Sequence, residues 1–169
     1  VLNQALQAAL NPPDENKVER RFGDWIFRAG DRVMQVKNNY DILWREDGGT
    51  DSGMGMFNGD IGVIREVDRE CITVDFDGKV VEYSPDMLGE LEPAFAVTVH
   101  KAQGSEYRAV ILAALDGAPM LMTRGVLYTA ITRAKELFII VGDDQAVERM
   151  VANNRQTRRY SGLRARLLS

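Results

Sequence analysis

Residues 30–93 are the part of this 169-residue chain that most limits what it can fold into. They consist of short runs rich in Val, Ile, Tyr and Phe that are separated by turn residues, without a long helical pattern. Asp77-Gly78 separates two of these runs, and this dipeptide suits a two-residue hairpin turn with positive φ. Four or five short strands of this kind predict a small β-barrel. The clearest expected strands are residues 32–36, 61–67, 71–76 and 79–83.

The glycine-rich, polar segment 45–60 lies between the first two of these strands. Polar stretches with several glycines are typical of loops. We therefore expect residues 45–60 to form a long, mobile loop of the barrel.

The segments on either side of the barrel have α/β patterns. Apolar residues recur at helical spacing over residues 1–10, and Asn11-Pro12-Pro13 ends this helix because proline cannot continue it. After Pro93, near-continuous apolar runs are typical of parallel strands that are buried on both faces. We expect, in order, a strand at 95–99, a polar loop, a strand at 109–115, a helix at 123–135, a strand at 136–142 and a helix at 144–152. This order predicts an open α/β domain that is interrupted by the barrel.

Charge is unevenly distributed along the chain. Residues 46–92 hold thirteen acidic and three basic residues, a net charge of 3 − 13 = −10, whereas residues 149–169 hold six arginines and no acid. The acidic segment argues against a phosphate-binding surface there. The arginine-rich end either contacts an anionic partner or forms a solvated helix face, which is the commoner meaning of such a run.

Several kinds of site are disfavoured by the sequence. The only Gly-Lys pair, Gly78-Lys79, is not part of a G-x-x-x-x-G-K-[ST] segment, so this chain cannot cradle a triphosphate alone. One cysteine and one histidine cannot build a Cys/His zinc cage, and we expect no metal site. Asp143 and Asp144 follow an apolar strand, as magnesium-binding acids do, but they also precede a helix that either could cap. A metal-dependent hydrolase that uses both acids stays an alternative.

The sequence lacks an apolar run long enough for a membrane helix, and its first residues do not resemble a secretion signal. We expect a cytoplasmic protein without a membrane partner. The chain starts at Val1, inside what reads as a helix, so we also expect it to be part of a longer protein.

Two groups of polar residues carry the candidate chemistry. The loop after residues 95–99 holds His100, Gly104 and Glu106, at the carboxyl end of an expected strand, where open α/β sheets bind ligands. Arg133 lies toward the end of the expected helix, and a rigidly held arginine can stabilise charge on a transferring phosphoryl group. Each group alone is more often ordinary: a histidine that hydrogen-bonds within a loop, and an arginine that complements a helix dipole.

Together, the two groups resemble a known family. "TVHKAQGSEY", residues 98–107, looks like motif V of superfamily 1 helicases, and "LYTAITRAKE", residues 127–136, looks like motif VI. Both have the form found in the RecD-like branch, the relatives of the exodeoxyribonuclease V alpha subunit. "GDRVMQVKNNYD" and "FNGDIGVI" are similar to the small barrel inserted into the second motor domain of that branch, and "LNQALQAALNPP" to the stretch before it.

The resemblance implies a fold and a division of the chain. The fold is α/β: a partial RecA-like (P-loop-type) second motor domain with an inserted Src-homology-3-like β-barrel. The motor domain would comprise residues 1–27 and 94–153, the barrel 28–93, and a basic tail 154–169.

The resemblance also implies site residues. Thr98 and His100 would lie along single-stranded DNA, Gly104 would face ATP by its backbone, and Glu106 would face the ribose. Arg133 would be the arginine finger that reaches the γ-phosphate. Lys101 and Gln103 have no assigned role.

The barrel of this family also helps to grip the DNA strand. Because the barrel is acidic here, contact would need stacking or local hydrogen bonds, from residues such as Asn38, Asn39 and Tyr40.

The whole enzyme would be an ATP-dependent 5′-to-3′ DNA helicase. ATP and Mg²⁺ would be bound mainly by an amino-terminal motor domain of the same polypeptide, and the chain alone would be inactive. Other recombination subunits are possible further partners. Two alternatives stay open: a non-enzymatic binding module built on the barrel, and the helicase half of a conjugative relaxase.

Overall fold

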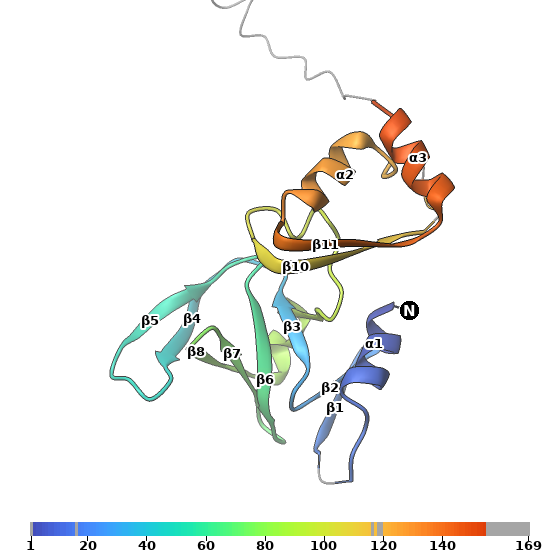
Figure 1. Cartoon of the computed structure of the whole chain (residues 1–169). Coiled ribbons are helices and arrows are strands. Elements are labelled where there is room, and N and C mark those ends of the chain that lie inside the picture. The colour runs from blue at the N-terminus through green and yellow to red at the C-terminus, as the bar shows by residue number, and fades with distance from the viewer. Residues whose placement is uncertain (1, 16, 116, 118–119, 155–169) are drawn as a thin grey trace, which may run out of the picture. The chain divides into compact units, whose positions relative to one another are not determined.

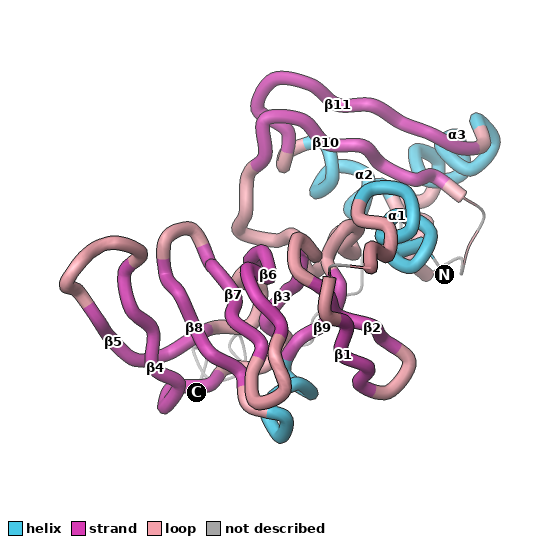
Figure 2. Tube along the Cα trace, turned by 90° about the horizontal axis from the view of Figure 1, so that it is seen from below, coloured by secondary structure: helices cyan, strands magenta, loops and turns pink. Residues whose placement is uncertain are grey.

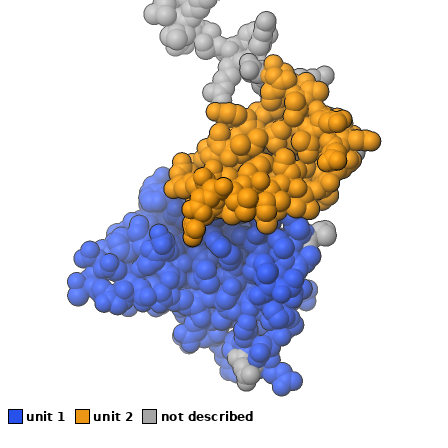
Figure 3. All heavy atoms as spheres, viewed as in Figure 1, with its two compact units in different colours: residues 1–98 blue, residues 99–169 orange. Residues whose placement is uncertain are grey.

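The computed structural model describes residues 2–15, 17–115, 117 and 120–154 (Figure 1). The chain divides into two compact units, residues 1–98 and 99–169, which Figure 3 shows in different colours. The basic tail expected at residues 154–169 lies, apart from Asn154, outside the described residues.

The barrel predicted for the first unit is confirmed. Its seven-stranded sheet, counted over the described residues, is antiparallel with the strand order β5-β4-β8-β7-β6-β3-β9 (Figure 2). The 3₁₀ helix η1 spans Pro85–Glu90 and lies between β8 and β9 in the chain. The strands are β3 (Arg32–Gln35), β4 (Asn39–Glu46), β5 (Ser52–Met56), β6 (Ile61–Val67), β7 (Ile72–Phe76), β8 (Lys79–Tyr83) and β9 (Leu91–Pro93).

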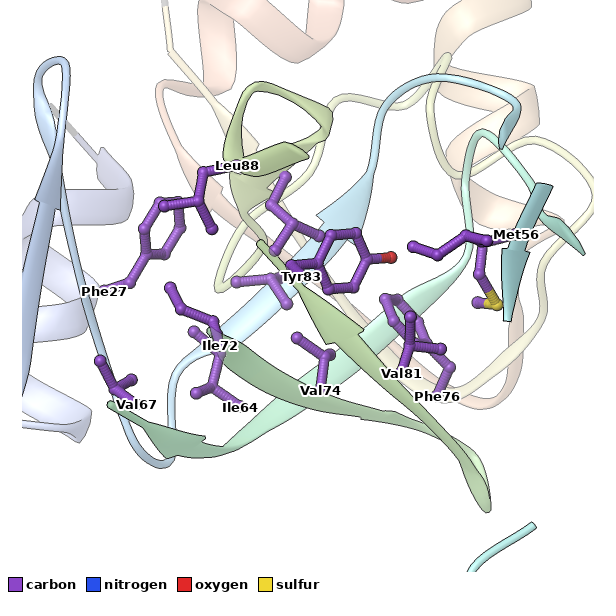
Figure 4. Close-up of a cluster of buried hydrophobic side chains, with 13 residues drawn as sticks. Phe27, Met56, Ile64, Val67, Ile72, Val74, Phe76, Val81, Tyr83 and Leu88 are labelled. Atoms are coloured by element: carbon purple, nitrogen blue, oxygen red, sulfur yellow. The ribbon is translucent and has the colours of Figure 1, made fainter. Parts of the chain in front are cut away.

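The hairpin β7–β8 forms as its turn residues predict. Asp77 and Gly78 have φ of 54° and 91°, as a two-residue turn between twisted strands requires. Alternate side chains of both strands point into one apolar core, in which Ile72, Val74 and Tyr83 are fully buried (Figure 4). This period of two is the pattern of strands with one buried face.

The prediction of a long loop at residues 45–60 is wrong, because these residues complete a hairpin. β5 pairs with β4, and Leu43 lies opposite Met54. The ring of Trp44 packs where a side chain at Gly53 would lie, since a Cβ there would come within 2.5 Å of Trp44 Cζ2. Because glycine is depleted in strands, Gly53 permits this packing and also makes β5 difficult to predict from the sequence.

Residues 2–15 and 17–28 contain one short helix and a hairpin. The helix α1 spans Leu2–Leu10, as expected, and the hairpin joins β1 (Glu19–Phe22) to β2 (Trp25–Arg28), which the sequence analysis did not anticipate. The expected boundary after residue 27 falls inside β2, and the Phe27 side chain belongs to the barrel core. These residues belong to the same compact unit as the barrel. Their assignment to a motor domain stays a prediction.

The helix α1 docks through side-chain amides. Asn3, Gln7 and Asn11 recur every four residues and therefore share one face. Asn3 bonds to the backbone of Ala96, while Gln7 and Asn11 donate to the buried carboxylate of Asp31 at 2.6 and 2.7 Å. The apolar residues of the helix stay largely exposed.

The second unit contains a β-α-β arrangement followed by a helix. β10 (Tyr107–Ala114) and β11 (Ala134–Gly142) are parallel and are joined through α2 (Arg124–Ile131). α3 (Asp144–Ala152) follows, with Asp143 as its cap: the carboxylate accepts a hydrogen bond from Gln145 N at 2.9 Å. Figure 1 shows both helices over one face of the strand pair.

Three expectations for this unit are wrong. The helix expected at residues 123–135 ends at Ile131, and Ala134 already belongs to β11. Residues 95–99 do not form a strand, and β10 and β11 are not buried on both faces, since Ile111 is 68% exposed. The sheet of this unit has two strands within the described residues, and a pair of strands cannot cover its own two faces. Of the helices that the structure describes, none has the length and apolar character needed to cross a membrane.

Candidate functional site

The loop that precedes β10 is built from two consecutive turns. Gln103 N donates to His100 O at 3.3 Å, and Ser105 N donates to Ala102 O at 3.2 Å. Gly104 has φ of +88°, a conformation that favours glycine over other residues. Ala102 is buried, whereas His100, Gly104 and Glu106 are exposed. The loop is thus held by its backbone and presents its polar groups outward.

Arg133 lies directly after α2 and folds onto this loop. Its Nη1 donates to Ser105 O at 3.1 Å, and its Nε donates to Thr129 O at 3.2 Å. Its carbonyl accepts from Tyr107 N at 2.8 Å. Arg133 therefore contacts the residues on both sides of Glu106 in the chain.

A second contact joins the same segments through charge. Lys135 Nζ lies 3.0 Å from Glu106 Oε2, and both side chains are more than half exposed. The structure thus brings together the predicted residues Glu106 and Arg133, next to Gly104. Lys135 was missed because its only sequence signal is its position in "TRAKE", two residues after Arg133.

Thr98 and His100 lie on either side of the division between the two units. Both residues are exposed. Solvent-exposed side chains beside the loop are accessible to a ligand.

The barrel candidates differ in how their side chains are used. Asn39 Oδ1 accepts from Asp41 N and Ile42 N at 3.1 Å, and its Nδ2 donates to Glu90 at 3.0 Å. Asn38 Oδ1 accepts from Asn58 N at 2.9 Å. These two amides therefore stabilise the start of β4.

Tyr40 is the barrel candidate with an open aromatic face. It is 65% exposed and packs edge-on against Phe57, which is 48% exposed, with ring centroids 5.8 Å apart. Phe57 was missed, and its signal would have been an aromatic residue in a polar, glycine-rich segment. The two ring planes are 73° apart, so each exposed ring offers its own face on which a planar group can stack.

Two of the three basic residues of the acidic barrel segment, Arg65 and Lys79, are engaged with neighbours. Arg65 pairs with Asp47 and with Asp75, and this guanidinium holds the pKa of Asp47 below its usual value. Lys79 lies over the ring of Trp44, 4.9 Å from its centroid. The expectation that the segment is not a phosphate-binding surface stays a prediction.

An open groove of about 500 Å³ lies on the barrel where β4 diverges from β8. Its lining includes two carboxylates and one guanidinium, from Asp41, Glu82 and Arg45. Mixed charge of this kind does not favour a polyanion.

Comparison with known families agrees with this geometry. Residues 2–76 match the family of ATP-dependent RecD-like DNA helicase SH3 domains, and residues 93–141 match the UvrD-like helicase C-terminal domain. In solved structures, the fold is similar to that of the Pif1 helicase from Bacteroides in complex with ADP-AlF3 and ssDNA. That likeness has a TM-score of 0.57 at 19% identity and covers 99% of this chain and 42% of that chain. The two matched domains and this fold define the C-terminal region of a superfamily 1 helicase.

The relatives identify the branch. The chain is 34% identical to the ATP-dependent RecD2 DNA helicase of Deinococcus radiodurans, over 93% of this chain and 20% of that protein. It is 36% identical to the RecBCD enzyme subunit RecD of Mycobacterium tuberculosis, over 70% of this chain and 20% of that protein. The chain belongs to the RecD-like helicases. It spans about a fifth of the length of these relatives.

Proposed function

We propose that this chain is the ATP- and DNA-coupling part of an ATP-dependent DNA helicase that moves in the 5′-to-3′ direction. The observation that carries the proposal is the contact of Arg133 with the carbonyl of Ser105, in the loop that also holds His100 and Glu106. One connected element then faces both DNA and nucleotide, as coupling requires.

Each residue has a role in this proposal. Arg133 is the arginine finger for the γ-phosphate, Gly104 approaches the nucleotide by its backbone, and Glu106 binds the ribose. Thr98 and His100 lie along the backbone of single-stranded DNA. A loop with an accessible glycine backbone, beside a cation and a carboxylate, fits a nucleotide.

The remaining parts of the ATP site would come from an amino-terminal motor domain. The phosphate-binding loop and the acids that hold Mg²⁺ are assigned to that partner domain, because this sequence lacks the phosphate loop. The chain alone is accordingly proposed to be inactive. A cytoplasmic location and contacts with other recombination subunits are part of the same proposal.

The barrel would contribute a sequence-independent contact with the strand. Tyr40 and Phe57 together offer exposed rings on which a base can stack. In this proposal Asn38 and Asn39 support these rings, since their amides bond to nearby barrel backbone and side chains.

The proposal is tested on the full-length protein with duplexes that carry a single-stranded tail at either the 5′ or the 3′ end. We expect ATP-dependent unwinding of the 5′-tailed duplex and DNA-stimulated ATP hydrolysis. Unwinding of the 3′-tailed duplex alone would contradict the direction. Absence of both ATP hydrolysis and DNA binding would favour the binding module.

A further inference from the structure

We propose that Lys135 is a positioning residue for nucleotide recognition, which holds the Glu106 carboxylate in the orientation that binds the ribose. This inference rests on the proposed function, in which Glu106 faces the ribose. Lys135 would act through Glu106 and would not contact the reacting phosphate.

The backbone around Glu106 is fixed by the residue two positions before Lys135. Arg133 accepts from Tyr107 N through its carbonyl, at 2.8 Å, and donates to Ser105 O through its guanidinium, at 3.1 Å. Both neighbours of Glu106 are therefore bonded to the same residue. The bond from Tyr107 N to the Arg133 carbonyl does not use the guanidinium, so it holds the backbone beside Glu106 even when the guanidinium turns to a phosphate.

The Glu106 carboxylate would otherwise be mobile. The side chain is 58% exposed, and an exposed glutamate has several accessible rotamers. The ion pair with Lys135, at 3.0 Å, selects one arrangement and uses Oε2. A carboxylate accepts several hydrogen bonds, so Oε1 can still accept one from a ribose hydroxyl.

Lys135 is itself well placed to act as a support. It is the second residue of β11, and the pairing of Ala134 with Tyr107 fixes the start of that strand against β10. Lys135 is 57% exposed, and an ion pair as exposed as this one adds little to folding stability. The role proposed for this pair is therefore to orient Glu106, and not to stabilise the fold.

The experiment compares Lys135→Gln with the parent in the full-length enzyme, by steady-state ATP hydrolysis on saturating single-stranded DNA. We expect KM for ATP to rise roughly two- to fivefold, with kcat within about twofold. The parent should have a lower KM for ATP than for the deoxy analogue, 2′-deoxy-ATP or 3′-deoxy-ATP, that lacks the hydroxyl contacted by Glu106. This difference in KM should be smaller in Lys135→Gln. Lys135→Arg should keep the KM for ATP and the preference for ATP of the parent, because arginine also pairs with carboxylates.

The neighbouring ion pair supplies a matched control. Arg108 Nε lies 3.0 Å from Glu136 Oε1 and joins β10 to β11, with side chains that are 84% and 59% exposed. Arg108→Gln should leave KM and the preference for ATP unchanged.

A double variant tests whether Lys135 acts through Glu106. In a Glu106→Gln background, adding Lys135→Gln should change KM no further, since the partner carboxylate is already gone. An undiminished effect in that background would overturn the proposal. So would an unchanged KM in Lys135→Gln, or a fall in kcat without a change in KM.

Failure of this inference is distinguishable from failure of the proposed function. If Arg133→Ala abolishes hydrolysis while Lys135→Gln behaves as the parent, only the role of Lys135 is wrong. If Arg133→Ala keeps normal hydrolysis, the proposed function fails.

Discussion

Arg133 Nη1 donates a hydrogen bond of 3.1 Å to the main-chain carbonyl of Ser105. A carbonyl is a neutral acceptor, whereas a phosphate is anionic and binds a guanidinium about twice as strongly. The Arg133 guanidinium can therefore exchange the Ser105 carbonyl for a phosphate. Ser105 N in turn donates to Ala102 O, within the loop that carries His100, so movement of Arg133 would be transmitted to that loop.

Replacing His100 by alanine in the full-length enzyme should weaken single-stranded DNA binding by roughly fivefold, the effect of one lost hydrogen bond. Nucleotide affinity should change less. Fluorescence anisotropy of a labelled oligonucleotide measures the DNA affinity. The salt concentration is held fixed, because salt alone shifts such affinities. Gln103→Ala, an exposed residue of the same loop, is the control. Equal DNA affinity for His100→Ala and the parent would contradict the assignment.

The aromatic pair of the barrel predicts a second DNA contact. Tyr40→Ala should lower affinity for single-stranded DNA by about 1–3 kcal/mol, the usual contribution of one stacked base, and Tyr40→Phe should not. Leu43→Ala is the control, since Leu43 is equally exposed, at 65%, on the same strand. If Tyr40→Ala and Leu43→Ala bind DNA alike, the barrel does not stack bases through Tyr40.

Tyr83 is predicted to stabilise the barrel through its hydroxyl. The hydroxyl donates to Gln35 Oε1 at 2.7 Å, and both side chains are fully buried. Tyr83→Phe leaves this acceptor without its partner, which costs about 1–3 kcal/mol of the free energy of unfolding. Urea unfolding near neutral pH measures the difference. A loss below about 0.5 kcal/mol would show that the bond is not a structural one.

The same variant should respond differently to alkaline pH. Burial raises the pKa of Tyr83 above its ordinary value of 10.0. Above that pH the unfolded chain loses the phenolic proton while the folded chain keeps it, so stability falls as pH rises. Phenylalanine has no such proton. The stability advantage of the parent over Tyr83→Phe should therefore shrink above about pH 10, and an advantage that grows would contradict the burial of the phenol.

Local chemistry decided which parts of the fold could be predicted. Asp77-Gly78 identifies its hairpin because few other residues take positive φ at both positions. Residues 95–99 mislead because they are apolar, yet the amide of Asn3 bonds to both the N–H and the carbonyl of Ala96. A side chain from far along the chain thus replaces a strand partner, which no local pattern can reveal.

The candidate site was predictable where residues follow a motif. Glu106 and Arg133 could be proposed because both belong to recognisable segments. Lys135 and Phe57 could not, because their significance lies in the neighbours Glu106 and Tyr40, which only the folded chain brings close.

The most direct test of the central claim is DNA-stimulated ATP hydrolysis by the full-length enzyme with Arg133→Ala. Arg124→Gln, at the start of the helix that precedes Arg133 in the chain, is the control. We expect Arg133→Ala to lower kcat by about 10³- to 10⁵-fold while ATP binding largely survives. Hydrolysis close to that of the parent would contradict the claim that Arg133 acts on the γ-phosphate.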